Sequence, residues 1–119
     1  MALLKKDEIL KSNDLTFEEL QVPEWGGTVR VKTMTGAERD EFEADVFESK
    51  GNSTKVNMRN FRAKLVSKCL VDEEGSRIFG DNEVEALGKK SAKALDRIFA
   101  IAQKINAIGQ KEVEELVKN

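Results

Sequence analysis

Apolar and polar positions alternate in one stretch near the N-terminus, and this pattern predicts a β-hairpin. A period of two is typical of a half-buried strand, and the residues that show it are Val29, Arg30, Val31, Lys32 and Thr33. Residues 18–22 are the expected partner strand, and residues 24–27 (Glu-Trp-Gly-Gly) are the expected turn, where glycine can take a positive φ. Pro23 has no N–H for a ladder, so we expect it at a strand end or edge.

Two segments with apolar residues at helical spacing follow the hairpin. The first begins with a capping box, in which the side chains of Thr35 and Glu38 can each satisfy the other's backbone amide. We expect a helix over residues 36–49, with an inner stripe around Phe42. A second helix is expected over residues 57–71. Its apolar stripe comprises Met58, Phe61, Leu65, Cys69 and Leu70.

Two more helices are expected after an Asp-Glu-Glu-Gly turn at residues 72–75 and a short extended piece. Asp81 can cap a short helix that runs to Leu87, and Ser91 can cap the helix with the strongest apolar pattern in the chain. The spacing of its apolar residues predicts one continuous face. That face comprises Leu95, Ile98, Phe99, Ala102, Ile105 and Ile108.

The remaining segments set the organisation of the chain. Residues 50–54 are small and polar, which predicts a mobile loop. We expect one domain over residues 1–119, with residues 1–14 as a flexible arm and residues 110–119 as a separate terminal helix. The predicted fold is α+β and helix-dominated, with an N-terminal β-hairpin packed on three to four α-helices. The expected core comprises Phe42, Val46, Phe61, Leu65, Leu70, Ile78, Phe79, Leu87, Leu95, Ile98, Phe99, Ala102 and Ile105.

Composition excludes several classes of protein. Lys and Arg total 20 against 22 Asp and Glu, and this balance argues against a protein that coats nucleic acid. No apolar run approaches the roughly 18 residues of a membrane helix, so no membrane partner is expected. Cys69 is the only cysteine, so no intrachain disulfide can form, which fits a reducing compartment such as the cytosol. The chain has no histidine, the commonest general base and metal ligand.

Two positions invite a chemical interpretation. A calcium loop counted from Asp72 would need glycine at its sixth position, where Arg77 stands, so a turn with positive φ at Gly75 is the better reading. Cys69 falls on the apolar face of its helix and has no histidine to activate it, which predicts a buried, unreactive thiol. We therefore expect no enzyme activity, no metal and no cofactor.

Charged residues cluster on the predicted helices. Two basic groups could contact phosphates, but a solvated helix face with ion pairs is the more common outcome. The groups are Arg59, Arg62, Lys64 and Lys68, and Lys89, Lys90, Lys93 and Arg97. An acidic face is likewise expected to be solvated, although it could meet a basic partner. It comprises Glu38, Glu41, Asp45 and Glu48.

The order of these segments resembles the tail assembly chaperones of long-tailed (siphovirus-type) bacteriophages. The hairpin over residues 22–31 and the helix start at residues 34–43 look like elements of that family. The later block at residues 70–79 (Leu-Val-Asp-Glu-Glu-Gly-Ser-Arg-Ile-Phe), followed by residues 84–87 and 91–99, resembles it more closely. Each motif alone also occurs at ordinary turns and helix starts. The resemblance therefore rests on the order and spacing of the motifs, and it covers about residues 18–106.

The resemblance implies a role in assembly. Such proteins bind the long tape measure protein in the host cytoplasm, keep it soluble and help tail tube subunits polymerise around it. They are not expected in the mature virion. Many genes of the family also give a longer product by ribosomal frameshifting, and its extension recruits the tail tube protein. Self-association is a further expectation, and the source could be a free phage or a prophage.

Candidate partner contacts are apolar residues that a client could cover. Trp25, the only tryptophan, lies at the hairpin tip, where it either folds back onto the core or anchors a partner. The other candidates are Phe47, Val113, Leu116 and Val117. Two other functions remain open. One is a structural virion component, such as a head–tail connector or minor tail protein, and the other is a small nucleic-acid-binding regulator.

Overall fold

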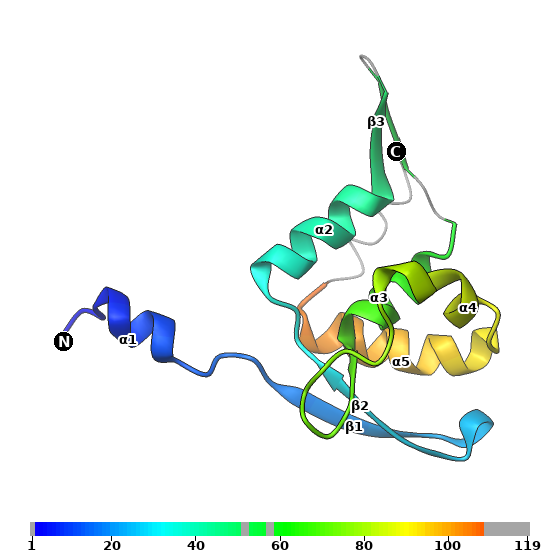
Figure 1. The fold of residues 1–119 in the computed structure, drawn as a ribbon, viewed down its shortest axis with the longest axis horizontal. Helices are drawn as coiled ribbons and strands as arrows, with labels where there is room; N and C mark the ends of the chain where they lie inside the picture. The colour runs from blue at the N-terminus through cyan, green and yellow to red at the C-terminus, as the bar shows by residue number, and fades with distance from the viewer. Residues whose placement is uncertain (1, 51–52, 57–58, 109–119) are drawn as a thin grey trace.

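The structure, a computed structural model, describes residues 2–50, 53–56 and 59–108, with only the backbone course for residues 48–50 and 53–56. Helices dominate, and short strands join them (Figure 1). The elements in chain order are α1 (Lys6–Lys11), β1 (Phe17–Val22), η1 (Pro23–Trp25), β2 (Gly27–Lys32), α2 (Gly36–Val46), β3 (Phe47–Lys50), β4 (Ser53–Val56), α3 (Phe61–Cys69), β5 (Leu70–Val71), η2 (Asp81–Glu83), α4 (Val84–Gly88) and α5 (Ala92–Ile105).

A three-stranded antiparallel sheet of order β1-β2-β5 forms the base of the fold. The predicted hairpin is confirmed, with Glu18 opposite Val31 and Val22 opposite Gly27. Its turn is a single 3-10 turn that begins at Pro23 and ends at Gly26, whose φ is +71°. The third strand, β5, was not expected, because residues 70 and 71 were assigned to the end of a helix. The predicted α+β, helix-dominated class is confirmed.

The core lies between the sheet and α3 and α5. Helix α5 contacts both β1 and β2, and it packs against α3. Its apolar face, predicted from spacing, is confirmed, because Leu95, Ile98 and Ala102 are buried. Three aromatic rings, of Phe42, Phe61 and Phe99, link α2, α3 and α5. Their centroids lie 5.6 Å apart for the first pair and 5.5 Å apart for the second.

Two predicted helices are shorter than expected. Helix α2 ends at Val46 instead of residue 49, and α3 begins at Phe61 instead of residue 57. The chain between them forms a second hairpin, β3–β4, in place of the predicted loop at residues 50–54. It projects from the body in Figure 1. Helix α3 starts where it does because Asn60 adopts a left-handed conformation with φ +55°, which no α-helix can contain.

The predicted core is confirmed except at Ile78, which is 48% exposed. The segment that contains it is extended, and Arg77 forms an isolated bridge with Val71. Arg77 donates from Nε to the Ser67 carbonyl at 2.9 Å. Ile78 lies at the surface of this segment, so its predicted place in the core is wrong.

Helix α1 stands apart from the rest of the molecule, joined to β1 by an extended stretch (Figure 1). None of its residues is buried. No helix in the described part of the chain is both long and apolar enough to cross a membrane.

Candidate functional site

The two positions that invited a chemical interpretation, Cys69 and the turn at Asp72, have structural roles. Cys69 is fully buried, and burial raises the pKa of its thiol to about 12. The thiol therefore stays protonated and unreactive, as predicted. The carboxylate of Asp72 accepts hydrogen bonds from the backbone amides of Glu74 and Ser76 at 2.9 and 3.0 Å. Gly75 follows with φ +84°. This confirms the predicted turn.

Half of the eight residues in the two basic groups pair with acids, namely Arg59, Arg62, Lys68 and Arg97. Arg59 lies 3.1 Å from Glu85, and Arg97 lies 3.0 Å from Glu24. Arg62 pairs with Asp96. These pairs occupy guanidinium groups that a phosphate backbone would otherwise contact.

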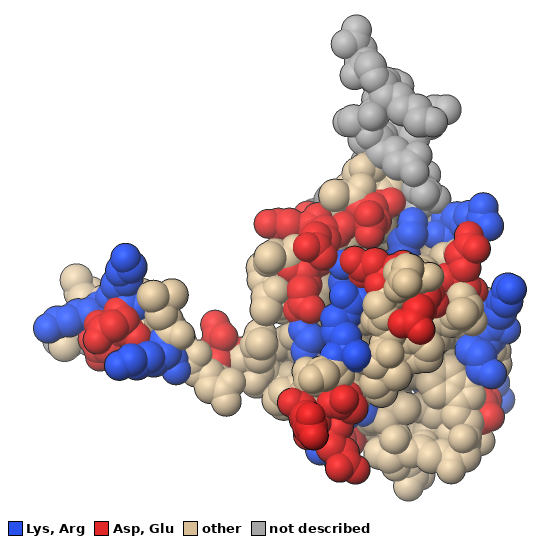
Figure 2. All heavy atoms as spheres, in the orientation of Figure 1, with Lys and Arg blue, Asp and Glu red and all other residues tan. Residues whose placement is uncertain are grey.

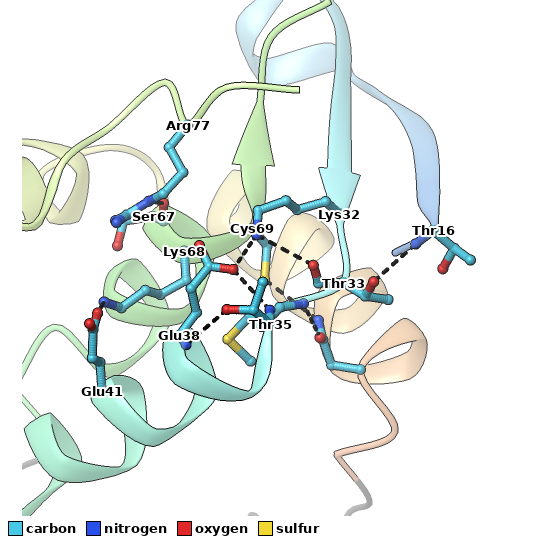
Figure 3. A network of polar contacts seen from close by, with 12 residues as sticks. Thr16, Lys32, Thr33, Thr35, Glu38, Glu41, Ser67, Lys68, Cys69 and Arg77 are labelled. Atoms are coloured by element: carbon cyan, nitrogen blue, oxygen red, sulfur yellow. Dashed lines mark hydrogen bonds and ion pairs between the residues drawn. The ribbon is translucent and has the colours of Figure 1, made fainter. Parts of the chain in front are cut away.

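Lys68 contradicts the prediction of a solvated face, since its side chain is only 2% exposed. Its Nζ lies 2.8 Å from a Glu41 oxygen and 3.2 Å from an Asp81 oxygen. Figure 3 shows the ammonium reaching across to α2. Burial alone would lower the pKa of Lys68, but its hydrogen bonds to Glu41 and Asp81 outweigh burial and raise it.

Asp81 does not cap a helix, contrary to the prediction. The residue before η2 is Gly80, whose amide is satisfied by Glu83 at 2.9 Å. Asp81 instead accepts from Arg77 at 2.9 Å and from Lys68. The hydrogen bond from Arg77 lowers the pKa of Asp81, against the opposite effect of burial. Asp81 thus links the buried ammonium of Lys68 to Arg77, in the segment that follows β5.

A second buried lysine, Lys32, anchors the start of α2. Its Nζ contacts the Glu38 carboxylate and the Thr33 carbonyl (Figure 3). The predicted capping box is present, since Thr35 donates its amide to Glu38 at 2.9 Å and accepts from the Glu38 amide at 3.1 Å. Burial pushes the pKa of Glu38 upward, but the hydrogen bonds from Lys32 and Thr35 outweigh it, so the pKa is lowered.

The acidic face of α2 is therefore only partly solvated, and this corrects the prediction. Glu38 and Glu41 turn toward buried lysines of β2 and α3. Asp45 is exposed, and the side chain of Glu48 lies outside what the structure describes. These ion pairs hold α2 on the body and offer no reactive centre.

The predicted partner contacts lie in different places. Trp25 packs against the core, which favours the first of its two interpretations. Its Nε1 is buried and has no hydrogen-bond partner in the described part of the chain. Phe47 is half-buried where α2 passes into β3. Val113, Leu116 and Val117 lie outside the described residues. The binding role of all five residues stays a prediction.

Two surfaces carry the large apolar side chains exposed in the described residues, and sequence reasoning named neither as a contact surface. The first is the predicted arm, here residues 2–14, and the second is the outer face of the sheet, which points away from α5. Their exposed apolar residues are Leu3, Leu4, Ile9 and Leu10 in the arm, and Phe17 and Ile78 on the outer face. Strand alternation could have placed Phe17, because it faces opposite to Leu20 and Val22.

The outer face of the sheet carries a shallow groove, which we call the outer groove. Strand β2 and the turn after β5 enclose it. It is lined by Glu19, Thr28, Val29, Arg30, Val71, Asp72, Glu73, Glu74 and Ile78. Arg30 joins the two sides, donating to Glu19 at 2.8 Å and to the Glu73 carbonyl at 3.1 Å. Its guanidinium carbon lies 5.9 Å from the centre of the Phe17 ring.

A family model described as phage tail assembly chaperone matches residues 6–118 of the chain. Comparison with curated proteins finds no match, and comparison with solved structures finds none either. Among the described residues no cluster of histidine, cysteine or carboxylate side chains could hold a metal ion.

Proposed function

Because the chain belongs to the family of phage tail assembly chaperones, we propose that it binds the tape measure protein of its phage. It covers apolar helices of that protein and keeps them soluble until tail tube subunits replace it. Binding is therefore reversible and of moderate affinity. The family match over residues 6–118 is the observation that carries this proposal.

Apolar side chains near the surface support a binding role, since clients are recognised through aromatic and aliphatic anchors. Phe47 is half-buried at the base of the projecting β3–β4 hairpin. Trp25 is only partly buried, so part of the residue remains accessible. We retain both residues as client contacts, together with Val113, Leu116 and Val117.

We propose further that the protein has no catalytic activity and needs no cofactor. Its one thiol is protonated and buried. The carboxylates with lowered pKa values and pairing partners, such as Glu38 and Asp81, are engaged with lysine or arginine. These contacts support a binding protein whose charged groups stabilise the fold.

The protein acts in the host cytoplasm in this proposal and is absent from the mature virion. The tail tube protein is a second partner, recruited through a longer product where frameshifting produces one. Two measurements decide these points. Mass spectrometry of purified particles reports on the virion, and immunoblotting of infected cells reports on a longer product.

Co-expression with the tape measure protein tests the central proposal. The tape measure protein should become soluble and co-purify with the tagged chain. Phe47→Asp and the combined variant Val113→Asp, Leu116→Asp and Val117→Asp should each reduce the captured amount about tenfold or more, since each removes apolar contact area. Ala100→Asp is the matched control, because Ala100 is exposed on α5.

A tape measure protein that stays insoluble and unbound in the presence of the wild-type chain would overturn the proposal. Finding the chain in purified virions would then favour the structural component. Binding to nucleic acid that falls steeply with salt would favour the regulator.

A further inference from the structure

The large apolar side chains that the described part of the chain exposes fall into two sets. Four belong to the arm, where Leu3 is 89% and Leu10 is 74% exposed. The other two are Phe17, at 50%, and Ile78, at 48%, beside the outer groove. Water contact with so many large apolar groups is unfavourable, at about 1.5–3 kcal/mol for each side chain that could be buried. Both sets therefore favour a covering partner.

The arm needs contacts that its own molecule does not supply. Helix α1 has six residues and buries none of them, and isolated helices of that length are not stable in water. The arm, residues 2–14, carries three lysines (Lys5, Lys6 and Lys11) and three carboxylates (Asp7, Glu8 and Asp14), so its net charge is zero. Figure 2 shows these basic side chains spread around its surface. The arm is thus an apolar segment that carries three lysines.

The outer groove is lined by apolar and acidic residues. Val71, which is buried, and Ile78 give it an apolar lining. Four carboxylates and one guanidinium line it, Glu19, Asp72, Glu73 and Glu74 against Arg30, a net charge of −3. Figure 2 shows acidic side chains gathered low on the body, where the turn after β5 crosses the hairpin in Figure 1. An apolar segment that carries lysines fits this surface.

The groove is a fixed surface. The turn behind it is held by hydrogen bonds from the Gly75 amide to the Asp72 carbonyl at 3.0 Å and from the Ile78 amide to the Leu70 carbonyl at 3.1 Å. The Phe17 ring lies beside Gly75, whose Cβ position would be 3.9 Å from it. Side chains that are already ordered lose little entropy when a partner binds.

The arm points away from its own groove. Ser12 ends α1 in an extended conformation, with φ −64° and ψ 139°. Thr16 is fixed to the sheet end by two hydrogen bonds with Thr33, at 2.9 and 3.0 Å. The stretch between them carries α1 outward (Figure 1). A neighbouring molecule can thus meet the arm without any change in the chain's path.

We propose that the arm of one copy docks in the outer groove of a second copy. Leu4, Ile9 and Leu10 cover Phe17 and Ile78, while the arm lysines approach the carboxylates of Glu73 and Glu74. The contact can be reciprocal, so that two copies exchange arms. It stands independently of client binding, because it concerns only this chain.

Sedimentation of the full chain tests the contact. The wild type should self-associate with rising concentration, whereas Leu10→Glu in the arm and Ile78→Glu in the groove should each weaken association at least about tenfold. Ala100→Glu, on an exposed position of α5, should associate as the wild type does. Mixing Leu10→Glu with Ile78→Glu should restore pairs, because one copy then supplies an intact arm and the other an intact groove.

Charge reversal gives a second readout that a folding defect could not imitate. Lys11→Glu and the double change Glu73→Lys with Glu74→Lys should each weaken association, and the combined variant should recover it. Recovery requires that the two sites meet.

Disulfide trapping identifies which groove the arm occupies. Leu10→Cys and Ile78→Cys in separate tagged copies should form a mixed disulfide on mild oxidation, whereas Leu10→Cys with Ala100→Cys should not. Cys69 does not interfere, because its thiol is buried and protonated. A wild type that stays monomeric at all concentrations overturns the proposal. So does a disulfide that forms only within one chain carrying both cysteines.

Discussion

Lys68 connects three segments of the protein. It lies on α3, and its ammonium meets Glu41 of α2 and Asp81 of η2. The side chains of its two partners are 61% and 60% exposed, so water reaches them while it barely reaches the lysine. Removing the lysine should therefore cost less free energy of unfolding than removing both carboxylates. A carboxylate without its lysine is solvated, whereas a lysine without its carboxylates stays buried.

This inequality gives a prediction. Lys68→Met should change the free energy of unfolding by less than about 1 kcal/mol, since an apolar chain of similar length fills the site. Glu41→Ala with Asp81→Ala should cost about 3 kcal/mol, because the ammonium is left without a carboxylate. Urea unfolding followed by the fluorescence of Trp25 measures both.

The triple variant Lys68→Met, Glu41→Ala and Asp81→Ala is the control. It should regain most of the stability that the double variant lost, as the buried charge is gone. A triple variant as unstable as the double variant would show that the carboxylates act through other contacts.

Acid should weaken the fold through Glu38 and Asp81. Both carboxyls have pKa values in the folded protein below their ordinary values of 4.5 and 3.8. Their contribution to the free energy of unfolding is complete above the ordinary values and is lost as the pH falls through the lowered ones. Lys68 acts at alkaline pH, because its pKa is raised in the folded protein. Its contribution to the free energy of unfolding is complete below its ordinary value of 10.5 and is lost as the pH rises through the raised pKa.

Urea midpoints measured from neutral pH to about pH 3 should stay level and then fall below about pH 4.5. Asp81→Asn should show a smaller fall than the wild type, since one of the titrating groups is removed. A midpoint that declines already between neutrality and about pH 6 is incompatible with these assignments, because the chain has no histidine.

For single residues, the sequence predicts polar contacts between near neighbours in the chain better than contacts between distant residues. The hydrogen bonds between Thr35 and Glu38 span three residues, and their motif can be read directly. The partners of Lys68 lie 27 and 13 residues away, so no spacing rule reveals them. The exposure of Ile78 likewise depends on how its segment pairs with β5, which the local pattern does not show.

Helix α5 provides the largest continuous apolar face of the fold. It lies on the sheet and against α3, and Ile98 at its middle is fully buried. The side chain of Asn106 closes its end, donating to the Ala102 carbonyl at 2.9 Å and accepting from the Met34 amide at 2.6 Å. The element thus joins the helical layer to the start of α2.

Ile98→Ala should lower the free energy of unfolding by about 3 kcal/mol, because it leaves a cavity in a closed site. Ile98→Val should cost only about 1 kcal/mol. Lys104→Ala, on the exposed side of the same helix, is the control for helix propensity and should change little. Equal losses for Ile98→Ala and Lys104→Ala would contradict the assignment of the buried face.

Elements that pack through one periodic face could be predicted, and those that depend on distant pairing could not. The face and cap of α5 follow from its own residues, including the Ser91 hydroxyl that accepts from the Ala94 amide at 3.3 Å. Strand β5 exists because residues 70 and 71 meet Val31 and Arg30, about forty positions earlier. The local pattern there favours a helix, and sheet pairing overrides it.

The molecule as a whole consists of a packed body and the arm. Removal of residues 2–11 should leave the thermal midpoint of the body unchanged, because α1 buries no residue. It should at the same time abolish the concentration-dependent association proposed for the arm. Calorimetry and sedimentation on one pair of samples measure both, and a large fall in the midpoint would contradict the division.

The arm and the outer groove could not be predicted as matching surfaces from the sequence. The sequence predicts residues 1–14 as a flexible arm, but no spacing within it indicates which surface it would meet. The groove combines residues from β1, β2 and the turn after β5, which lie up to about sixty positions apart. Only the arrangement of all three elements brings its acidic and apolar side chains together.

The position of β5 in the sheet determines when this protein can fold during its synthesis. The β1–β2 hairpin leaves the ribosome early, but its third strand follows about forty residues later, and α5, which covers its inner face, is the last of the described elements. A lone hairpin is at best marginally stable. The nascent chain therefore carries uncovered strands until Ile105 has emerged.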